Sequence, residues 1–97
     1  MEIRTLDDQL SVSGQVTPEE LAALAARGVR HIICNRPDGE GADQPAYAEV
    51  QRAAEAAGIQ AHYLPVVAGK VSDAEARDFG QLLDAIEGPV HAYCRTG

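Results

Sequence analysis

The sequence predicts an α/β fold, with a mainly parallel sheet flanked by helices. Three observations lead to this prediction. Short β-branched and apolar runs alternate with segments whose apolar residues recur at helical spacing. Glycine, or a Gly-Pro pair, follows each helical segment and marks its end. Strands separated by helices of roughly 10–15 residues form right-handed crossovers within one sheet, so the strands are expected to run parallel.

The chain begins with a predicted hairpin and a predicted helix. Residues 3–6 and 10–13 alternate in hydropathy around two aspartates, which is typical of a β-hairpin or of two edge strands. The run Thr17-Pro18-Glu19-Glu20 predicts a helix start. Its threonine can cap the helix, its proline fits the first position, and its last glutamate completes a capping box.

Three helix–strand units are predicted after the hairpin. The first unit begins with the helix that starts at residues 17–20. Ser72 and Glu75 form a second capping box, and the loop at 35–41 is irregular by composition. The remaining predicted elements are, in order, strand 29–34, helix 47–57, strand 59–67, helix 72–86 and strand 90–93.

Composition and charge narrow the function classes. Residues 1–97 are expected to form a single domain. The net charge of −7 and the 4% aromatic content argue against a nucleic-acid partner, which needs clustered cations or stacking platforms. No apolar run approaches the roughly 20 residues that cross a bilayer, and no leader-like segment begins the chain. We therefore expect a cytoplasmic protein with no membrane or nucleic-acid partner.

The sequence implies neither a cofactor nor a metal. Cys34 and Cys94 are too few for a disulfide framework, and both are expected as thiols in a reducing compartment. His31, His62 and His91 share no metal-ligand spacing and lie in or beside predicted strands. Structural imidazoles are the better interpretation.

The most informative segment is Cys94-Arg95-Thr96-Gly97, which follows the last strand. Ligands of parallel sheets bind at the carboxyl ends of the strands. A turn that contains glycine can direct backbone N–H groups at one point, where they hold an oxyanion and stabilise a thiolate. We therefore expect this segment to lie at one edge of the sheet together with the loop at 35–41 and the loop at 66–71.

Cys94 has two interpretations. A small thiol buried at a strand end is the simpler one, because cysteine is among the most buried residue types. The arginine directly after it, the glycine three residues on and its place at the ligand-binding edge together favour a nucleophile. We take Cys94 as the catalytic candidate, with Arg95, Thr96 and Gly97 binding the anionic group of the substrate.

The terminal Cys-Arg-Thr-Gly run resembles the active-site loops of protein tyrosine phosphatases and of rhodaneses. The chain as a whole resembles the phosphatase-like domain of the beta-lactamase hydrolase-like family. The matching stretches include Val-Arg-His-Ile-Ile-Cys-Asn-Arg-Pro-Asp at 29–38 and Tyr-Leu-Pro-Val at 63–66. The resemblance covers nearly all of the chain and implies a dual-specificity-phosphatase-like fold, in which the helix expected after the Cys94 loop is lacking here.

Members of that family are described as phosphatases and as sulfur transferases. Some are fused to a metallo-β-lactamase-like persulfide dioxygenase, which is therefore a candidate fused or associated partner. The resemblance implies a small substrate that is either a sulfur compound or a phosphate ester. An arginine at the fifth position after Cys94 would give a rhodanese-sized loop and one at the sixth a phosphatase loop, and both positions lie beyond Gly97.

Two departures from dual-specificity phosphatases bear on the reaction. The residue before the nucleophile is Tyr93 where those enzymes usually have histidine, and Ala68 stands where they carry a general-acid aspartate. A general acid speeds ester cleavage by about 10²–10⁴-fold, whereas sulfur transfer to a thiolate releases no alkoxide that needs a proton. Arg95 also fits the rhodanese Cys-Arg-x-Gly pattern. Sulfur transfer through a Cys94 persulfide is therefore ranked first.

Two other functions remain open. One is phosphatase activity through a phosphocysteine intermediate, for which Asp73 could serve as a substitute acid. The other is a non-catalytic domain that binds an anion at this loop. Arg36 and Asp38 lie in the loop at 35–41, where they either form a surface turn or contact the substrate. Cys34 is interpreted as a core thiol, and the alternative is a redox pair with Cys94.

Overall fold

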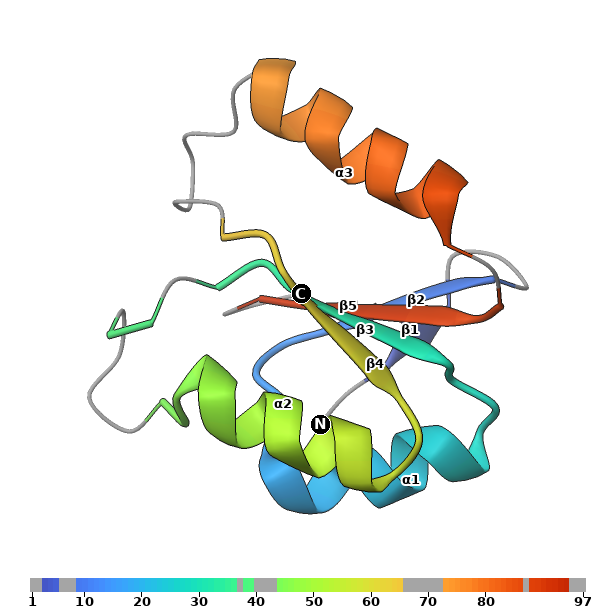
Figure 1. Ribbon diagram of the computed structural model, residues 1–97, viewed down its shortest axis with the longest axis vertical. Coiled ribbons are helices and arrows are strands. Elements are labelled where there is room, and N and C mark those ends of the chain that lie inside the picture. Colours follow the sequence, from blue (N-terminus) through green and yellow to red (C-terminus); the bar gives the residue numbers. More distant parts are fainter. Residues whose placement is uncertain are drawn as a thin grey trace.

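The computed structural model shows a five-stranded sheet with helices on both faces (Figure 1). It describes residues 3–5, 9–36, 38–39, 44–65, 73–86 and 88–94, without the side chain of Glu75. Its elements are β1 (Arg4–Thr5), β2 (Leu10–Ser13), a single 3₁₀ turn (Pro18–Glu20), α1 (Leu21–Ala26), β3 (His31–Cys34), α2 (Tyr47–Ala56), β4 (Gln60–Tyr63), α3 (Asp73–Ala85) and β5 (Val90–Tyr93). No helix in these ranges is long and apolar enough to span a bilayer.

The sheet is mainly parallel, as the sequence predicts. The strand order is β1-β2-β5-β3-β4, and only the β1–β2 hairpin is antiparallel. The last strand in the chain, β5, therefore lies in the middle of the sheet. All four of its residues are buried, which suits a strand paired on both edges and covered on both faces.

The helix ends follow the predicted signals. The Glu20 carboxylate accepts hydrogen bonds from the Thr17 backbone N–H at 2.8 Å and from its hydroxyl at 3.0 Å. Gly28 and Gly58 follow α1 and α2 with φ of +91° and +81°, a left-handed conformation that glycine adopts without strain. The second predicted capping box includes Ser72, which lies outside the described residues.

Two strands begin later than predicted, for one physical reason. The N–H of Val29 donates to Leu24 O at 3.1 Å, and that of Ile59 donates to Ala54 O at 2.8 Å. Each bond closes the end of the preceding helix, as in a Schellman motif. The N–H of each residue is therefore bonded to the preceding helix and not to a neighbouring strand, although the side chains of both residues are buried in the core. The strand β4 also ends earlier than predicted, at Tyr63, and the proline at position 65 has no N–H to donate to a sheet; residues 66 and 67 lie outside the described residues.

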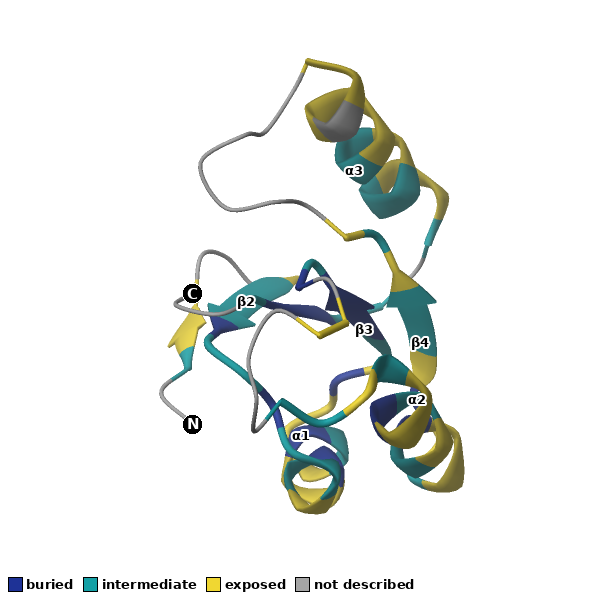
Figure 2. Ribbon diagram, turned by 90° about the vertical axis from the view of Figure 1, so that its left-hand side faces the viewer, coloured by how far each residue is buried: buried dark blue, intermediate teal, exposed yellow. Residues whose placement is uncertain are grey.

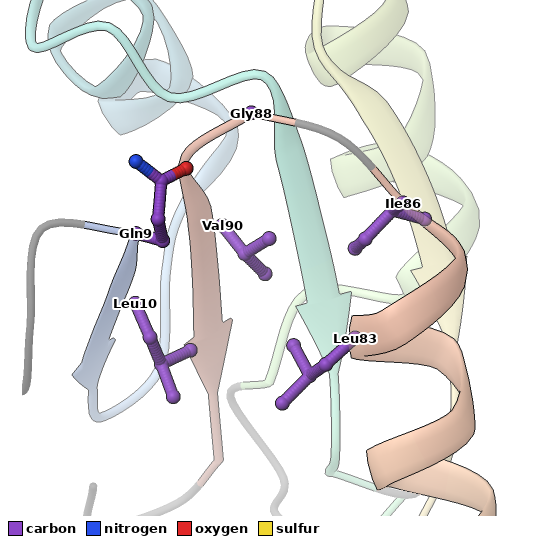
Figure 3. A pocket seen from close by; sticks show the side chains of 6 residues that line it. All are labelled: Gln9, Leu10, Leu83, Ile86, Gly88 and Val90. Atoms are coloured by element: carbon purple, nitrogen blue, oxygen red, sulfur yellow. The ribbon is translucent and has the colours of Figure 1, made fainter.

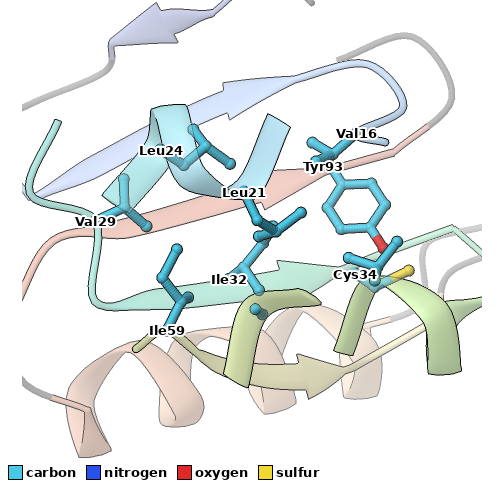
Figure 4. Packing of buried hydrophobic residues seen from close by; sticks show 10 residues of the cluster. Val16, Leu21, Leu24, Val29, Ile32, Cys34, Ile59 and Tyr93 are labelled. Carbon is cyan, nitrogen blue, oxygen red and sulfur yellow. The ribbon is translucent and has the colours of Figure 1, made fainter. Parts of the chain in front are cut away.

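The main core lies between the sheet and the helices α1 and α2 (Figures 1 and 4). It is built mostly of aliphatic side chains, with Cys34 and Tyr93 at the carboxyl end of the strands. Its buried members are Val16, Leu21, Leu24, Val29, Ile32, Cys34, Val50, Ala54, Ile59 and Tyr93.

The opposite face of the sheet is covered by α3 and carries a second, smaller core cluster (Figure 2). The buried members of this cluster are Ile33, Val90 and Ala92. A cavity of about 220 Å³ lies on this side, lined mainly by Leu10, Leu83, Ile86 and Val90 (Figure 3). Because Val90 begins β5, this cavity is at the end of the strand opposite to Cys94.

Candidate active site

Cys94 directly follows the central strand, as predicted for a residue at the ligand-binding edge. Its backbone N–H donates to Ser13 O at 3.2 Å, which joins it to the end of β2. Its neighbour on the other side is the end of β3, where the Asn35 N–H donates to Tyr93 O at 2.9 Å. Cys94 is half-buried. The backbone of Cys94 thus lies between the ends of the two flanking parallel strands, β2 and β3.

The strand ends are further tied together on the β4 side. The Leu64 N–H donates to Cys34 O at 2.9 Å, and the Asn35 side-chain amide donates to Leu64 O at 3.0 Å. The segments after β3, β4 and β5 are therefore brought to one edge of the sheet, as the sequence predicts. The predicted loop at 66–71 lies outside the described residues, as do Arg95, Thr96 and Gly97.

Arg36 connects the two segments that flank Cys94. It follows β3, is 9% exposed, and donates from Nη1 to Gln15 Oε1 at 2.8 Å. Gln15 follows β2, and its own amide donates to Val16 O at 2.7 Å. Because β5 lies between β2 and β3, this bond spans the end of the central strand. A buried guanidinium at this place puts a permanent positive charge near the candidate site.

Asp38 has a structural role in the same loop. Its Oδ1 accepts a hydrogen bond from the Tyr47 N–H at 2.8 Å, at the start of α2, and its own N–H donates to Tyr63 Oη at 3.0 Å. The rings of Tyr47 and Tyr63 stack with centroids 4.6 Å apart. The following residue, Gly39, has φ of +79°. The backbone role of Asp38 is thus visible, and substrate contact stays a prediction.

Cys34 is a core thiol. It is 2% exposed, its Sγ donates to Arg36 O at 3.2 Å, and it hydrogen-bonds the Tyr93 hydroxyl (Figure 4). Burial raises the pKa of the Cys34 thiol, and burial likewise raises that of the Tyr93 hydroxyl. No disulfide joins Cys34 to Cys94.

The three histidines lie in hydrogen-bonded positions on the strands. His91 is fully buried between Ser11 and Ser13, whereas the half-buried rings of His31 and His62 stack with Nδ1 and Nε2 3.1 Å apart. Within the described ranges, no group of three potential metal ligands occurs.

Sequence reasoning missed Ser13 and Gln15. Both lie after or at the end of β2, and both contact the segments around Cys94. Their involvement follows from the insertion of β5 between β2 and β3. The crossover rules predict a parallel sheet but leave the position of its last strand open.

Comparison with known proteins agrees with this architecture. The profile of the family "Beta-lactamase hydrolase-like protein, phosphatase-like domain" matches residues 2–97. A candidate phosphatase from Neisseria meningitidis, known from its crystal structure, superposes with a TM-score of 0.90 at 40% identity, over 96% of this chain and 66% of that one. TpbA from P. aeruginosa shows the same fold, with a TM-score of 0.71 at 22% identity, over 96% of this chain and 52% of that one.

A curated relative, the beta-lactamase hydrolase-like protein of Xylella fastidiosa, is 35% identical over 97 residues. The match covers 100% of this chain and 22% of the relative, so the chain spans about a fifth of that protein's length. The sheet has the α/β arrangement of the protein tyrosine phosphatase-like neighbours. The chain therefore belongs to the phosphatase-like domains of the beta-lactamase hydrolase-like proteins.

Proposed function

We propose that this domain hydrolyses phosphate esters, with Cys94 as its nucleophile. The observation that carries the proposal is the position of Cys94: half-buried, at the carboxyl end of the central parallel strand, with a buried arginine bridging the two flanking segments. A nucleophile needs access to substrate, and an anionic substrate needs a fixed positive charge and oriented donors. The half-buried Cys94 supports the first requirement and the buried Arg36 guanidinium supports the fixed charge, while the oriented donors are part of the proposal.

The proposed reaction has two steps. The Cys94 thiolate attacks phosphorus, an S–P bond forms as the ester P–O bond breaks, and the leaving oxygen takes a proton from solvent or an acid. Water then attacks the phosphocysteine, which releases inorganic phosphate and restores the thiolate. The phosphoryl oxygens would be held by the backbone N–H groups of Arg95, Thr96 and Gly97, and Arg36 would add positive potential. Asp38 would order the loop that carries Arg36.

Phosphate esters take first place over sulfur compounds because of the comparisons. The family is phosphatase-like, and the Neisseria protein at 40% identity is a phosphatase candidate. TpbA, which shares only the fold with this chain, was crystallised in complex with pTyr. An aryl phosphate is therefore the first substrate to try. This reverses the ranking that the residues of the catalytic loop suggest on their own.

Sulfur transfer is kept as a second candidate on one observation, the alanine at position 68 where related phosphatases carry an acid. The Cys94 thiolate would attack the outer sulfur of thiosulfate, forming an S–S bond as sulfite leaves with the electron pair of the broken bond. An acceptor thiol would then take the sulfur from the persulfide. A fused or associated persulfide dioxygenase, for which the longer curated relatives have room, would fit this reaction.

The experiment that tests the proposal measures both reactions on the longest natural form of the chain. We expect turnover of an activated aryl phosphate that is lost in Cys94→Ser. An Ala68→Asp variant should act faster on esters with poor leaving groups, because the new carboxyl can protonate the leaving oxygen. Intact mass spectrometry after thiosulfate treatment detects a persulfide as a gain of about 32 Da.

The outcomes separate the candidates. A Cys94-dependent persulfide without phosphate turnover would reject the phosphatase and establish the sulfur transferase. Neither product, with inorganic phosphate still bound, would leave a non-catalytic anion-binding domain.

A further inference from the structure

His91 is the most deeply buried polar side chain that the proposed reaction leaves unused. It lies on β5, is 0% exposed, and faces the α1 and α2 side of the sheet together with Tyr93. Both of its ring nitrogens are engaged: Nδ1 lies 2.8 Å from Ser11 Oγ, and Nε2 lies 2.7 Å from Ser13 Oγ. Both serines are on the neighbouring strand β2. Because both of its nitrogens are hydrogen-bonded, the buried imidazole ring has a fixed orientation.

The direction of these hydrogen bonds can be deduced. The Ser13 hydroxyl donates its only proton to Gly14 O, at 2.8 Å. Toward His91 the Ser13 oxygen must therefore accept, so the ring proton is on Nε2. Nδ1 then accepts from the Ser11 hydroxyl. Burial lowers the pKa of His91 to about 4, Arg27 adds to the lowering and Glu20 opposes it, so the ring is neutral at pH 7.

Ser13 is also the residue that holds the nucleophile. Its carbonyl oxygen accepts the hydrogen bond from the Cys94 N–H at 3.2 Å, while its side chain joins His91 to the next carbonyl of the chain. One residue thus links the fully buried imidazole to the backbone of Cys94. His91 itself precedes Cys94 by three residues. Ser13 is therefore hydrogen-bonded to both ends of the short segment from His91 to Cys94.

We propose that His91 is a positioning residue that, through Ser13, fixes the backbone of Cys94 at the end of β5. The proposal rests on the proposed role of Cys94 as a nucleophile. His91 does not touch the substrate. It keeps the Ser13 carbonyl in place, and this orients the N–H of Cys94.

Two matched pairs of variants test this role. Ser13→Ala and Ser11→Ala each remove one hydrogen bond to His91, and only the first touches the residue that holds Cys94. His91→Gln has an amide that reaches the Nε2 position and can still donate to Ser13, whereas the amide of His91→Asn reaches only the Nδ1 position. We expect a selective defect at Cys94 in Ser13→Ala and His91→Asn, with rescue in His91→Gln.

The first measurement is amide hydrogen exchange, which needs no catalysis. The reference is the Leu64 N–H, which donates to Cys34 O at the end of the neighbouring strand pair. We expect exchange at Cys94 to rise about tenfold relative to Leu64 in the two defective variants, as for the loss of one hydrogen bond. Parallel changes at both amides in all four variants would mean that His91 only stabilises the fold, and the proposal would be rejected.

The second measurement is the pH profile of Cys94 alkylation by iodoacetamide. We expect the profile to shift in Ser13→Ala and His91→Asn, and to stay within about twofold of wild type in His91→Gln. If wild-type Cys94 alkylates faster than an ordinary thiol, identical profiles in all variants would reject the positioning role even if exchange changes. A wild-type Cys94 that alkylates like an ordinary thiol and turns over no substrate would instead refute the proposed function, while the exchange result would still decide whether His91 holds this backbone.

Discussion

Two thiols end neighbouring parallel strands of this sheet, and their surroundings differ sharply. Cys34 ends β3, is almost fully buried, and its sulfur contacts Arg36 O and the Tyr93 hydroxyl. Cys94 follows β5 and is half-buried, with its backbone held by Ser13. A thiol at the carboxyl end of a parallel strand is therefore not made reactive by that position alone.

The direction of the Cys34 side chain accounts for its burial. Cys34 and Tyr93 are paired residues on adjacent strands, and both face the core formed with α1 and α2. Cys94 comes one residue after Tyr93, the last residue of β5. Burial favours the neutral thiol, so Cys34 is suited to packing. Access to the edge of the sheet suits Cys94 to chemistry.

The largest expected effect is on turnover in the two Cys→Ser variants. Cys94→Ser should lower aryl phosphate hydrolysis by at least about 10³-fold, because a hydroxyl is a far weaker nucleophile than a thiolate. Cys34→Ser should keep activity within about threefold. Steady-state kinetics on both purified variants provide the measurement. An equal loss in the two variants would mean that Cys34 takes part in the reaction, as in a redox pair.

Much of this contrast was predictable from the sequence. The order of elements, the parallel sheet and the place of Cys94 after a strand all follow from periodicity and from glycine positions. The pairing of β5 with β2 was not predictable, because it depends on how four strands share one core. Ser13 and Gln15 were missed for that reason, and the hydrogen bond from Tyr93 to Cys34 likewise depends on strand register.

The next effect is the pH dependence of stability. It should come from His91 on β5, the strand that leads to Cys94, and not from β3, the strand that ends in Cys34. The folded-state pKa of His91 is about 4 against an ordinary 6.5, so the unfolded chain binds more protons between these values. The stability from neutral His91 is full above about pH 6.5 and falls as the pH drops to 4, by roughly 3 kcal/mol. Urea unfolding from pH 7.5 to 4 measures it.

The matched comparison is His91→Gln, whose free energy of unfolding should lack the part of the fall between pH 6.5 and 4 that is due to His91. His62→Gln should retain most of it, although burial also lowers the pKa of His62. Wild type and His91→Gln losing stability in parallel across this range would show that other groups, such as the carboxylates, cause the whole acid dependence.

Arg36 provides the third contrast, because its backbone oxygen contacts the Cys34 thiol and its side chain bridges the two segments that flank Cys94. Arg36→Gln should lower kcat/KM for an aryl phosphate by about 10–100-fold, as expected for the loss of a charged hydrogen-bonding group. Arg52→Gln makes the same charge change on the exposed surface of α2, where Arg52 Nε donates to Ala48 O at 3.4 Å. Its activity should stay near wild type. Equal effects of the two substitutions would point to net charge as the cause.

The rate of alkylation compares the reactivity of the two thiols directly. At pH 7.5 we expect Cys94 in the Cys34→Ser protein to react with iodoacetamide at least about tenfold faster than Cys34 in the Cys94→Ser protein. Burial hinders reagent access to Cys34 and raises its pKa, and thiolate is the reacting form. Equal rates in the folded proteins would remove the distinction between the two thiols.

The smallest effect should come from Tyr93→Phe, which separates burial from hydrogen bonding at Cys34. The substitution keeps the ring in the core and removes the hydroxyl that bonds the thiol, so stability should fall by about 1 kcal/mol. That bond lowers the pKa of Cys34 against the larger effect of burial, so its loss should make Cys34 still less reactive. Tyr63→Phe is the matched control, because Tyr63 is 40% exposed and its hydroxyl accepts an exposed hydrogen bond, so this substitution should cost less stability. A Cys34 that alkylates faster in Tyr93→Phe would show that the tyrosine hydroxyl, and not burial, keeps this thiol unreactive.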